Sequence, residues 1–282
     1  MRQKARIPLR RLRTRARHAL GEARRGLAGA PPGPRALLLV LGCQRSGTTL
    51  MLDLLERDPD AKIYPEHSAI SARDPHGLRL APIPVVAARL GRSRYPLVVL
   101  KPLVESQQAP ALLEGLPRAR GLWMFRHYAD VARSNLERFG ERNGIRNLRS
   151  VAHAADDWRG EGVSDEVAGV VRERFSESMN PWDAAALFWW ARNALFFEQA
   201  LDARPDVRTC RYEELVADPL RVLRCVYAFT GCDFPRFASL PGVSSTSVGR
   251  GREVPLSADV AALCDALLGR LEKAHAGATR CG

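Results

Sequence analysis

The sequence predicts an α/β fold in which helices cover both faces of a parallel sheet. Four short apolar runs have the composition of buried strands, and segments of helical spacing follow them after turns. Strands that alternate with helices over short connections are typical of parallel sheets. The first predicted strand begins at Leu37, and the other three cover residues 97–101, 121–125 and 207–211.

Helices are predicted on both sides of this sheet. Asn180 is a good N-cap, Pro181 suits the first helical position, and Gly231 suits a helix end. Residues 62–95 are rich in proline and are expected to form loops with short helices. The predicted helices cover residues 48–57, 109–116, 129–139, 181–203, 219–229 and 257–273.

The basic character of the chain is concentrated at its N-terminus. Of the net charge of +12, residues 1–35 carry +10, from eleven Lys and Arg against Glu22 alone, so the rest of the chain is close to neutral. This distribution argues against a nucleic-acid-binding body. We predict a basic arm and linker over residues 1–35 and one domain over residues 36–282. The arm is expected to contact an anionic membrane surface or another polyanion, or else to have no partner.

The cysteine pattern and the hydropathy of the arm indicate where in the cell the protein is expected. The arm has no apolar stretch of the kind found in signal peptides and is too polar to span a bilayer. The six cysteines include no Cys-x-x-Cys pair and have no histidine at metal-ligand spacing. We therefore expect reduced thiols, no bound metal and a cytoplasmic protein, with peripheral attachment to a membrane surface left open.

Residues 37–50, LLLVLGCQRSGTTL, predict a strand that turns through glycine into a helix. Such a turn presents free backbone N–H groups and the positive end of the helix dipole to an anion. Gly42 and Gly47 stand at the glycine positions of the Walker A pattern, but Thr48 replaces its lysine. Arg45 is the only cation in the loop. The segment predicts a P-loop-type phosphate site without the apparatus for a triphosphate, or a plain strand–turn–helix.

This loop resembles the 5′-phosphosulfate loop of sulfotransferases that use 3′-phosphoadenosine 5′-phosphosulfate (PAPS). The likeness is to the branch whose loop reads R-S-G-T-T-L, which includes the tyrosylprotein sulfotransferases and many bacterial enzymes. The resemblance implies the sulfotransferase fold. A sulfuryl group carries less charge than a γ-phosphoryl group, so one arginine and backbone donors can suffice without a metal. The implied cofactor-binding residues of the loop are Arg45, Ser46, Gly47, Thr48, Thr49 and Leu50.

Two further segments follow predicted strands. Arg126 closes the third strand and Ser134 lies eight residues later; sulfotransferases use an arginine and a serine at this spacing to hold the cofactor's 3′-phosphate. Lys101 closes the second strand, where family members carry a lysine that stabilises charge on the leaving phosphate. The resemblance implies these roles, with Arg45 sharing that of Lys101. The alternative for Arg126 and Ser134 is a solvated helix face. The alternative for Lys101 is a lysine at a strand end that reaches solvent.

A carboxylate and an imidazole are the candidates for the base that accepts the proton of the acceptor hydroxyl. In the tyrosylprotein-like branch a glutamate stands twenty-one residues after the loop arginine, and Glu66 has this spacing from Arg45. Partial burial can bring a carboxylate into the range needed for a base. The ordinary pKa of a histidine is already close to neutral pH, so His67 remains the alternative. Neither residue is catalytic if both only cap a loop.

Weaker indications come from the C-terminal third of the chain. Tyr212 opens a block that resembles a family segment near the nucleotide, and stacking, hydroxyl donation and plain packing all remain open for it. Residues 244–252 combine hydroxyls, glycines and arginines. The resemblance implies a loop that closes over the cofactor, with Arg250 or Arg252 at the 3′-phosphate, and a plain surface loop is the alternative. The aromatic residues 188–190, 196 and 197 recur at helical spacing, which predicts core packing, with one ring that lines an acceptor pocket as the alternative.

The resemblance thus implies an enzyme that moves a sulfuryl group from PAPS to an acceptor hydroxyl by in-line attack. Glu66, Lys101 and Arg45 would be its catalytic residues. A carbohydrate, a lipid, a phenol or a peptide would carry the hydroxyl. The alternatives are a P-loop nucleotide-dependent phosphotransferase of the kinase type, against which Thr48 argues, and a polyanion-binding protein that acts through the arm.

Overall fold

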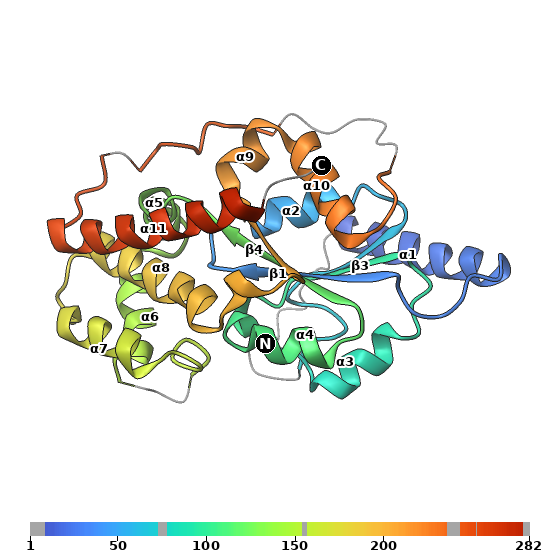
Figure 1. Ribbon diagram of the computed structural model, residues 1–282, viewed down its shortest axis with the longest axis horizontal. Coiled ribbons are helices and arrows are strands. Elements are labelled where there is room, and N and C mark those ends of the chain that lie inside the picture. The colour runs from blue at the N-terminus through green and yellow to red at the C-terminus, as the bar shows by residue number, and fades with distance from the viewer. Residues whose placement is uncertain (1–8, 73–77, 154–156, 236–242, 252, 279–282) are drawn as a thin grey trace, which may run out of the picture.

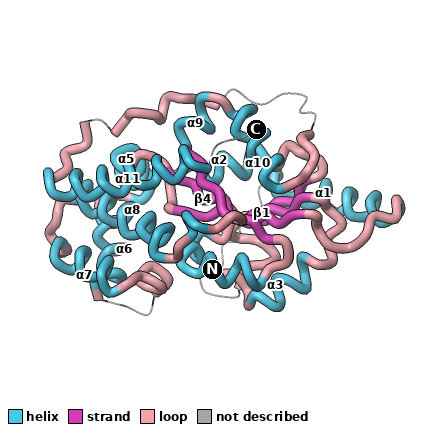
Figure 2. Tube along the Cα trace, in the orientation of Figure 1, coloured by secondary structure: helices cyan, strands magenta, loops and turns pink. Residues whose placement is uncertain are grey.

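The computed structural model describes residues 9–72, 78–153, 157–235, 243–251 and 253–278. Its centre is a five-stranded sheet in the order β2-β3-β1-β4-β5, and every neighbouring pair is parallel (Figures 1 and 2). The predicted parallel α/β fold is therefore confirmed. The strands are β1 (Ala36–Gly42), β2 (Ala61–Tyr64), β3 (Leu97–Leu100), β4 (Ala119–Phe125) and β5 (Val207–Arg211).

The strand β2 corrects the prediction of loops and short helices over residues 62–95. It has four residues, the polar Lys62 interrupts its apolar pattern, and it pairs only with β3. Its position at the sheet edge, which long-range pairing decides, gives it a strand conformation that its own composition does not predict.

All six predicted helices are present, and further helices occur in the segments between them. Asn180 caps α8 by accepting a hydrogen bond from the backbone N–H of Trp182, and Gly231 ends α10 with φ 69°. The helix α8 ends at Glu198, earlier than predicted, because Ala200 takes a left-handed conformation. The helices are α1 (Leu9–Leu27), α2 (Thr48–Leu55), α3 (Ile83–Leu90), α4 (Ala109–Gly115), α5 (Tyr128–Phe139), α6 (Arg142–Ala152), α7 (Asp165–Arg174), α8 (Pro181–Glu198), α9 (Tyr212–Ala217), α10 (Pro219–Thr230) and α11 (Ala258–Ala278), with 3₁₀ turns η1 (Leu103–Gln108) and η2 (Leu201–Ala203).

Each face of the sheet has its own apolar core. On one face, Leu38 and Val40 pack with side chains of α2, α9 and α10. On the other, Leu39 and Trp123 pack with side chains of α3, α4, α8 and α11. Helices α6 and α7 complete a third cluster against α8, away from the sheet (Figure 1). Because both faces are covered, the carboxyl ends of the strands are where the sheet can contact a ligand.

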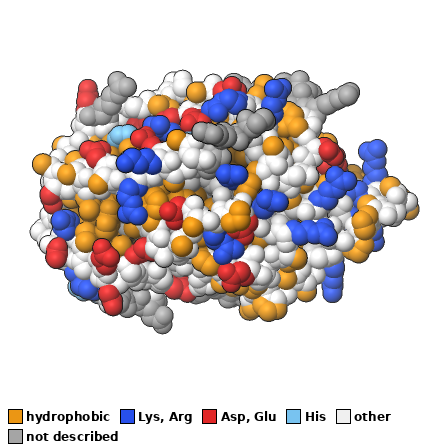
Figure 3. All heavy atoms as spheres, in the orientation of Figure 1, with side chains coloured by type: hydrophobic (Ala, Val, Ile, Leu, Met, Phe, Trp, Pro, Cys, Tyr) orange, Lys and Arg blue, Asp and Glu red, His pale blue; other side chains and the backbone are white. Residues whose placement is uncertain are grey.

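The described part of the basic arm begins with the helix α1, which lies against the β2 edge of the sheet. The Glu22 carboxylate of α1 accepts hydrogen bonds from Lys62 Nζ (2.6 Å), Ser93 Oγ (3.1 Å) and the backbone N–H of Arg94 (3.0 Å). The Tyr95 hydroxyl donates to the carbonyl of His18 at 3.1 Å. Lys and Arg side chains gather over this end of the molecule in Figure 3. The division of the chain at residue 35 remains a prediction.

Within the described ranges, none of the helices combines the length and the apolar character needed to cross a bilayer.

Docking of α1 is expected to weaken in mild acid. Burial, with Arg17 and Lys62 nearby, lowers the pKa of His18 to about 4, whereas an unfolded chain titrates a histidine near 6.5. Between these values the unfolded state binds more protons, so the free energy of unfolding falls as the pH drops from about 6.5 toward 4. We expect the urea midpoint of the wild type to fall more between pH 7 and pH 5 than that of His18→Gln. Equal pH dependence in both proteins would contradict this assignment.

Candidate active site

A cavity of about 580 Å³ lies where the carboxyl ends of the five strands meet. Each strand, or the turn that follows it, contributes to the wall. These residues are Gly42 at the end of β1, Glu66 after β2, Lys101 after β3, Arg126 after β4 and Tyr212 after β5.

The turn from β1 into α2 forms a concave run of backbone. Arg45 and Gly47 have φ values of 69° and 87°, both left-handed, and Gly47 precedes the first turn of α2. Left-handed residues that alternate with ordinary ones, at a helix start, aim successive N–H groups toward one point and form an anion-binding site. A Cβ on Gly47 would clash with the ring of Tyr212, so only glycine fits there. The left-handed arginine costs about 1–2 kcal/mol.

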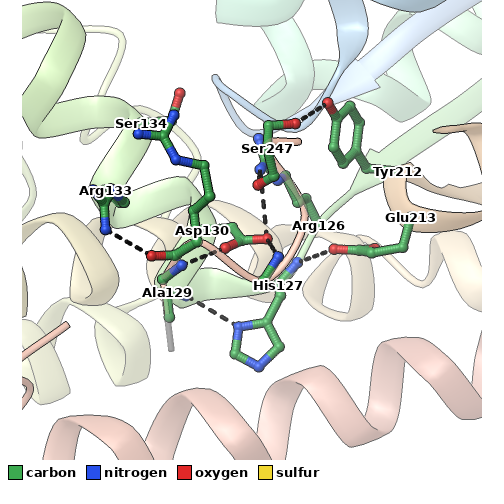
Figure 4. A network of polar contacts seen from close by, with 12 residues as sticks. Arg126, His127, Ala129, Asp130, Arg133, Ser134, Tyr212, Glu213 and Ser247 are labelled. Carbon is green, nitrogen blue, oxygen red and sulfur yellow. Dashed lines mark hydrogen bonds and ion pairs between the residues drawn. The ribbon is translucent and has the colours of Figure 1, made fainter. Parts of the chain in front are cut away.

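Arg126 is buried beside this turn and is held from three sides. Its guanidinium stacks on the Tyr212 ring at 4.3 Å, donates to the carbonyl of Ser247, and lies 3.4 Å from Asp130 Oδ2 (Figure 4). Its Nε is buried and has no hydrogen-bond partner among the described residues. The side chain therefore keeps one donor for a group that enters the cavity.

The loop of residues 243–251 is attached to α5 through a buried carboxylate. Asp130 accepts hydrogen bonds from the backbone N–H groups of Gly249 (2.8 Å) and Gly251 (2.7 Å). The Tyr212 hydroxyl bonds to Ser247 Oγ at 2.7 Å (Figure 4). The loop, the Arg126 side chain and the β1–α2 turn are therefore one connected structure.

Arg45 extends from the β1–α2 turn to α5. Its Nε donates to Ser134 Oγ at 2.9 Å. Partial burial, with the guanidinium groups of Arg138 and Arg126 nearby, lowers the pKa of Arg45. Crowded cations of this kind are stabilised by a bound anion, because each repels the others when the site is empty of counter-charge.

Glu66 and Lys101 meet at the start of α2. Lys101 Nζ is 3.0 Å from Glu66 Oε2 and donates to Thr49 Oγ1 at 3.0 Å. Both side chains line the cavity, and Lys101 is buried. A carboxylate and an ammonium group therefore stand together beside the anion-binding turn.

The charged residues of the cavity wall are mostly basic. Among the described residues that line it, Glu66 is the single one with a carboxylate. In the described part of the chain, no group of three His, Cys, Asp or Glu side chains is placed to hold a metal ion. The cations of the wall are Arg45, Lys101, Arg126, Arg138, Arg159 and Arg192.

Comparison with known proteins identifies the fold. No protein-family model and no curated protein matches the sequence. Among solved structures, the sulfotransferase domain from the curacin biosynthetic pathway aligns over 86% of this chain and 98% of its own, with a TM-score of 0.54 and 15% identity. The sulfotransferase domain of the Synechococcus PCC 7002 olefin synthase aligns over 84% and 96%, with a TM-score of 0.52 and 17% identity. The chain has the sulfotransferase fold. At this identity the likeness concerns the fold alone.

The structure brings most of the predicted site residues to one cavity. Ser46 is fully buried beneath the turn, and Ser134 is joined to it through Arg45. Arg250 differs: its side chain reaches Glu137 at 3.2 Å and does not line the cavity. Arg252 lies outside the described residues. Those that line the cavity are Arg45, Gly47, Thr48, Thr49, Leu50, Glu66, Lys101, Arg126 and Tyr212, together with His67.

Asp130 and three arginines of the cavity wall, Arg138, Arg159 and Arg192, were not predicted from the sequence. Asp130 stands four residues after Arg126, which is the spacing of an ion pair on a helix, and this signal was present in the sequence. Arg192 interrupts the apolar run of α8, so a charge inside a buried helix was a second signal.

Removing the carboxylate charge at Asp130 is expected to loosen the loop of residues 243–251. Asp130→Asn weakens two charge-assisted hydrogen bonds, each worth roughly 1.5–3 kcal/mol. Amide hydrogen exchange at Gly249 and Gly251 should become at least about tenfold faster, with β1 and β4 unchanged. Glu137→Gln, which removes a carboxylate charge that contacts the arginine side chains of residues 133 and 250 and no backbone N–H of the loop, is the control. Equal exchange in both variants would contradict the role of Asp130.

Proposed function

We propose that this protein is a sulfotransferase that moves a sulfuryl group from PAPS to an acceptor hydroxyl. The observation that carries the proposal is the meeting of Glu66 and Lys101 beside the anion-binding turn, in one cavity with Arg126. A base, a cation and an anion site are the three parts that transfer to a hydroxyl requires. The sulfotransferase fold supports the same reaction class.

The residues present fit a ligand with two separated anionic groups. The β1–α2 turn offers backbone N–H groups, with the buried hydroxyl of Ser46 lacking a hydrogen-bond partner in the described ranges. Arg126 keeps a free Nε at the other anion site, next to the Tyr212 ring. We assign the phosphosulfate of PAPS to the turn, its 3′-phosphate to Arg126 and Ser134, and a packing surface for the nucleotide to Tyr212.

PAPS supplies a sulfuryl group on a 5′-phosphate that departs as part of adenosine 3′,5′-bisphosphate. Glu66 accepts the proton of the acceptor hydroxyl while the new oxygen–sulfur bond forms and the bond from sulfur to the phosphate oxygen breaks. The electron pair of the broken bond remains on that phosphate oxygen, where Lys101 and Arg45 stabilise the charge. The product is a sulfate monoester.

The alternative phosphotransferase is not favoured. Thr48 stands where the Walker lysine would contact the β- and γ-phosphates, and its side chain is buried at the start of α2. Lys101 is instead bonded to Thr49 and paired with Glu66.

Binding of adenosine 3′,5′-bisphosphate should depend on Arg126. A guanidinium–phosphate contact contributes roughly 2–3 kcal/mol, so Arg126→Ala should weaken binding by about 30- to 150-fold in calorimetric titration. Arg146→Ala, an exposed arginine of α6, is the control and should bind as the wild type does. ATP without Mg²⁺ should bind less tightly than the bisphosphate. Preference for ATP, or no binding by folded protein, would overturn the proposed function.

Loss of the Glu66 carboxylate should affect turnover and leave cofactor binding intact. Removal of a general base costs roughly 10²- to 10⁴-fold, and Glu66→Gln keeps the size of the side chain. The measurement is transfer of ³⁵S from labelled PAPS to a panel of hydroxyl-bearing acceptors, beside bisphosphate titration. Glu173→Gln on the exposed face of α7 is the control. Full turnover in Glu66→Gln, with loss in His67→Gln, would assign the base to His67.

A further inference from the structure

Part of the cavity wall combines apolar side chains with one buried cation. We call this region the inner chamber; its residues are Leu103, Val104, Trp158, Phe188 and Arg192. Leu103 follows Lys101 by two residues, and its carbonyl accepts a bond from Arg192 Nη2 at 3.4 Å. Tyr212 and Arg126 belong to the other side, beside the β1–α2 turn. Lys101, which precedes Leu103 by two residues, is bonded to Thr49 of α2.

Arg192 is buried, and none of the described residues forms an ion pair with it. Its side chain is 2% exposed, and Nη2 reaches only neutral oxygens, of Gln107 (3.2 Å) and Leu103. Its Nη1 has no hydrogen-bond partner in the part of the chain that the structure describes. A buried guanidinium that lacks a carboxylate is unfavourable for folding, so its retention needs another reason.

The acidic residues nearest to Arg192 are engaged by other arginines. Glu105 and Glu161 lie 2.7 and 2.9 Å from Arg79, and Asp157 lies 2.7 Å from Arg159. Burial lowers the pKa of Arg192 to about 10, which leaves the group protonated at neutral pH. Arg79 balances only one of the two glutamates, so the remaining carboxylate charge acts on Arg192 at longer range, and no described carboxylate contacts its guanidinium directly.

The ring of Trp158 lies against the Arg192 guanidinium. It lies 5.3 Å from the Arg192 guanidinium and 4.5 Å from that of Arg159, so it is flanked by two cations. Phe188, one turn before Arg192 on α8, adds a second aromatic surface to the same chamber. An apolar ligand body and one anionic group suit this arrangement.

On the basis of the proposed function, we propose that the acceptor is a hydroxy acid. Its carboxylate pairs with Arg192, its apolar body contacts Trp158 and Phe188, and its hydroxyl reaches Glu66. The planar guanidinium matches a carboxylate in shape, and its unpartnered Nη1 can donate to one negative group. This selects hydroxy acids among the carbohydrates, lipids, phenols and peptides that carry hydroxyl groups.

Two pairs of probes test the proposal by calorimetric titration of the bisphosphate-loaded protein. The pairs are 3-(4-hydroxyphenyl)propanoate and 6-hydroxyhexanoate, each beside its primary amide, which keeps the hydroxyl and the body and removes the charge. We expect the acid of at least one pair to bind roughly 10- to 100-fold more tightly than its amide. In Arg192→Gln the acid should bind no better than the amide, with bisphosphate affinity unchanged.

Arg149→Gln is the matched control, because it removes the charge of an exposed arginine of α6 that pairs with Glu177. It should keep the full preference for the acid. Equal affinity for acid and amide in both wild-type pairs, or a preference that survives Arg192→Gln, would overturn the proposal. Repeating the titration without bisphosphate separates the two proposals. A wild type that does not bind bisphosphate but prefers the acid through Arg192 would overturn the proposed function and retain the anion site.

Stability measurements distinguish ligand recognition by Arg192 from a purely structural role. Because Arg192 forms no direct ion pair with a described carboxylate, Arg192→Gln should unfold at the same temperature as the wild type or at a higher one. Arg192→Lys keeps the charge without the planar fork and should retain only part of the preference for the acid. A large loss of thermal stability in both variants, with the acid preference of Arg192→Lys equal to that of the wild type, would contradict recognition by the guanidinium.

Discussion

The contact between the Tyr212 ring and Gly47 is the constraint on which the rest of the cavity depends. The ring occupies the space that a side chain at residue 47 would need, and it also stacks on Arg126 at 4.3 Å. Its hydroxyl bonds to Ser247 at 2.7 Å. One aromatic side chain thereby positions the anion-binding turn, the buried guanidinium and the loop of residues 243–251. Because these segments come from β1, β4 and the C-terminal third, the fold must form before the site exists.

The parallel sheet explains why residues so far apart in sequence converge. Every strand ends at the same edge, so each polar residue that follows a strand adds to one wall. Glu66 shows the importance of order within the sheet: it follows β2, which pairs only with β3, and Lys101 follows β3. Pairing of these two strands brings the carboxylate within 3.0 Å of the ammonium group. The edge strand that composition did not predict is thus the one that carries the proposed base.

Local signals in the sequence predicted the elements, and packing decided what they missed. The apolar runs before Gly42 and Phe125 and the cap at Asn180 are local, and they were sufficient for four strands and six helices. Three other features depend on partners distant in sequence, which no single segment encodes. They are the strand β2, the docking of α1 through Glu22, and the burial of Arg192 without a direct ion pair to a described residue. The placement of Arg250 on Glu137 is of the same kind. Roles for the individual site residues remain predictions.

The pairing of Lys101 with Glu66 also bears on how charge would move during the proposed reaction. Before transfer, the ammonium group of Lys101 is largely compensated by the carboxylate 3.0 Å away. When Glu66 accepts the acceptor's proton it becomes neutral, and Lys101 gains an uncompensated charge while negative charge develops on the departing phosphate. The hydrogen bond from Lys101 to Thr49, in the first turn of α2, holds the ammonium group at the anion-binding turn throughout. A single proton transfer would then switch the lysine from its carboxylate partner to the leaving group, without movement of either backbone segment.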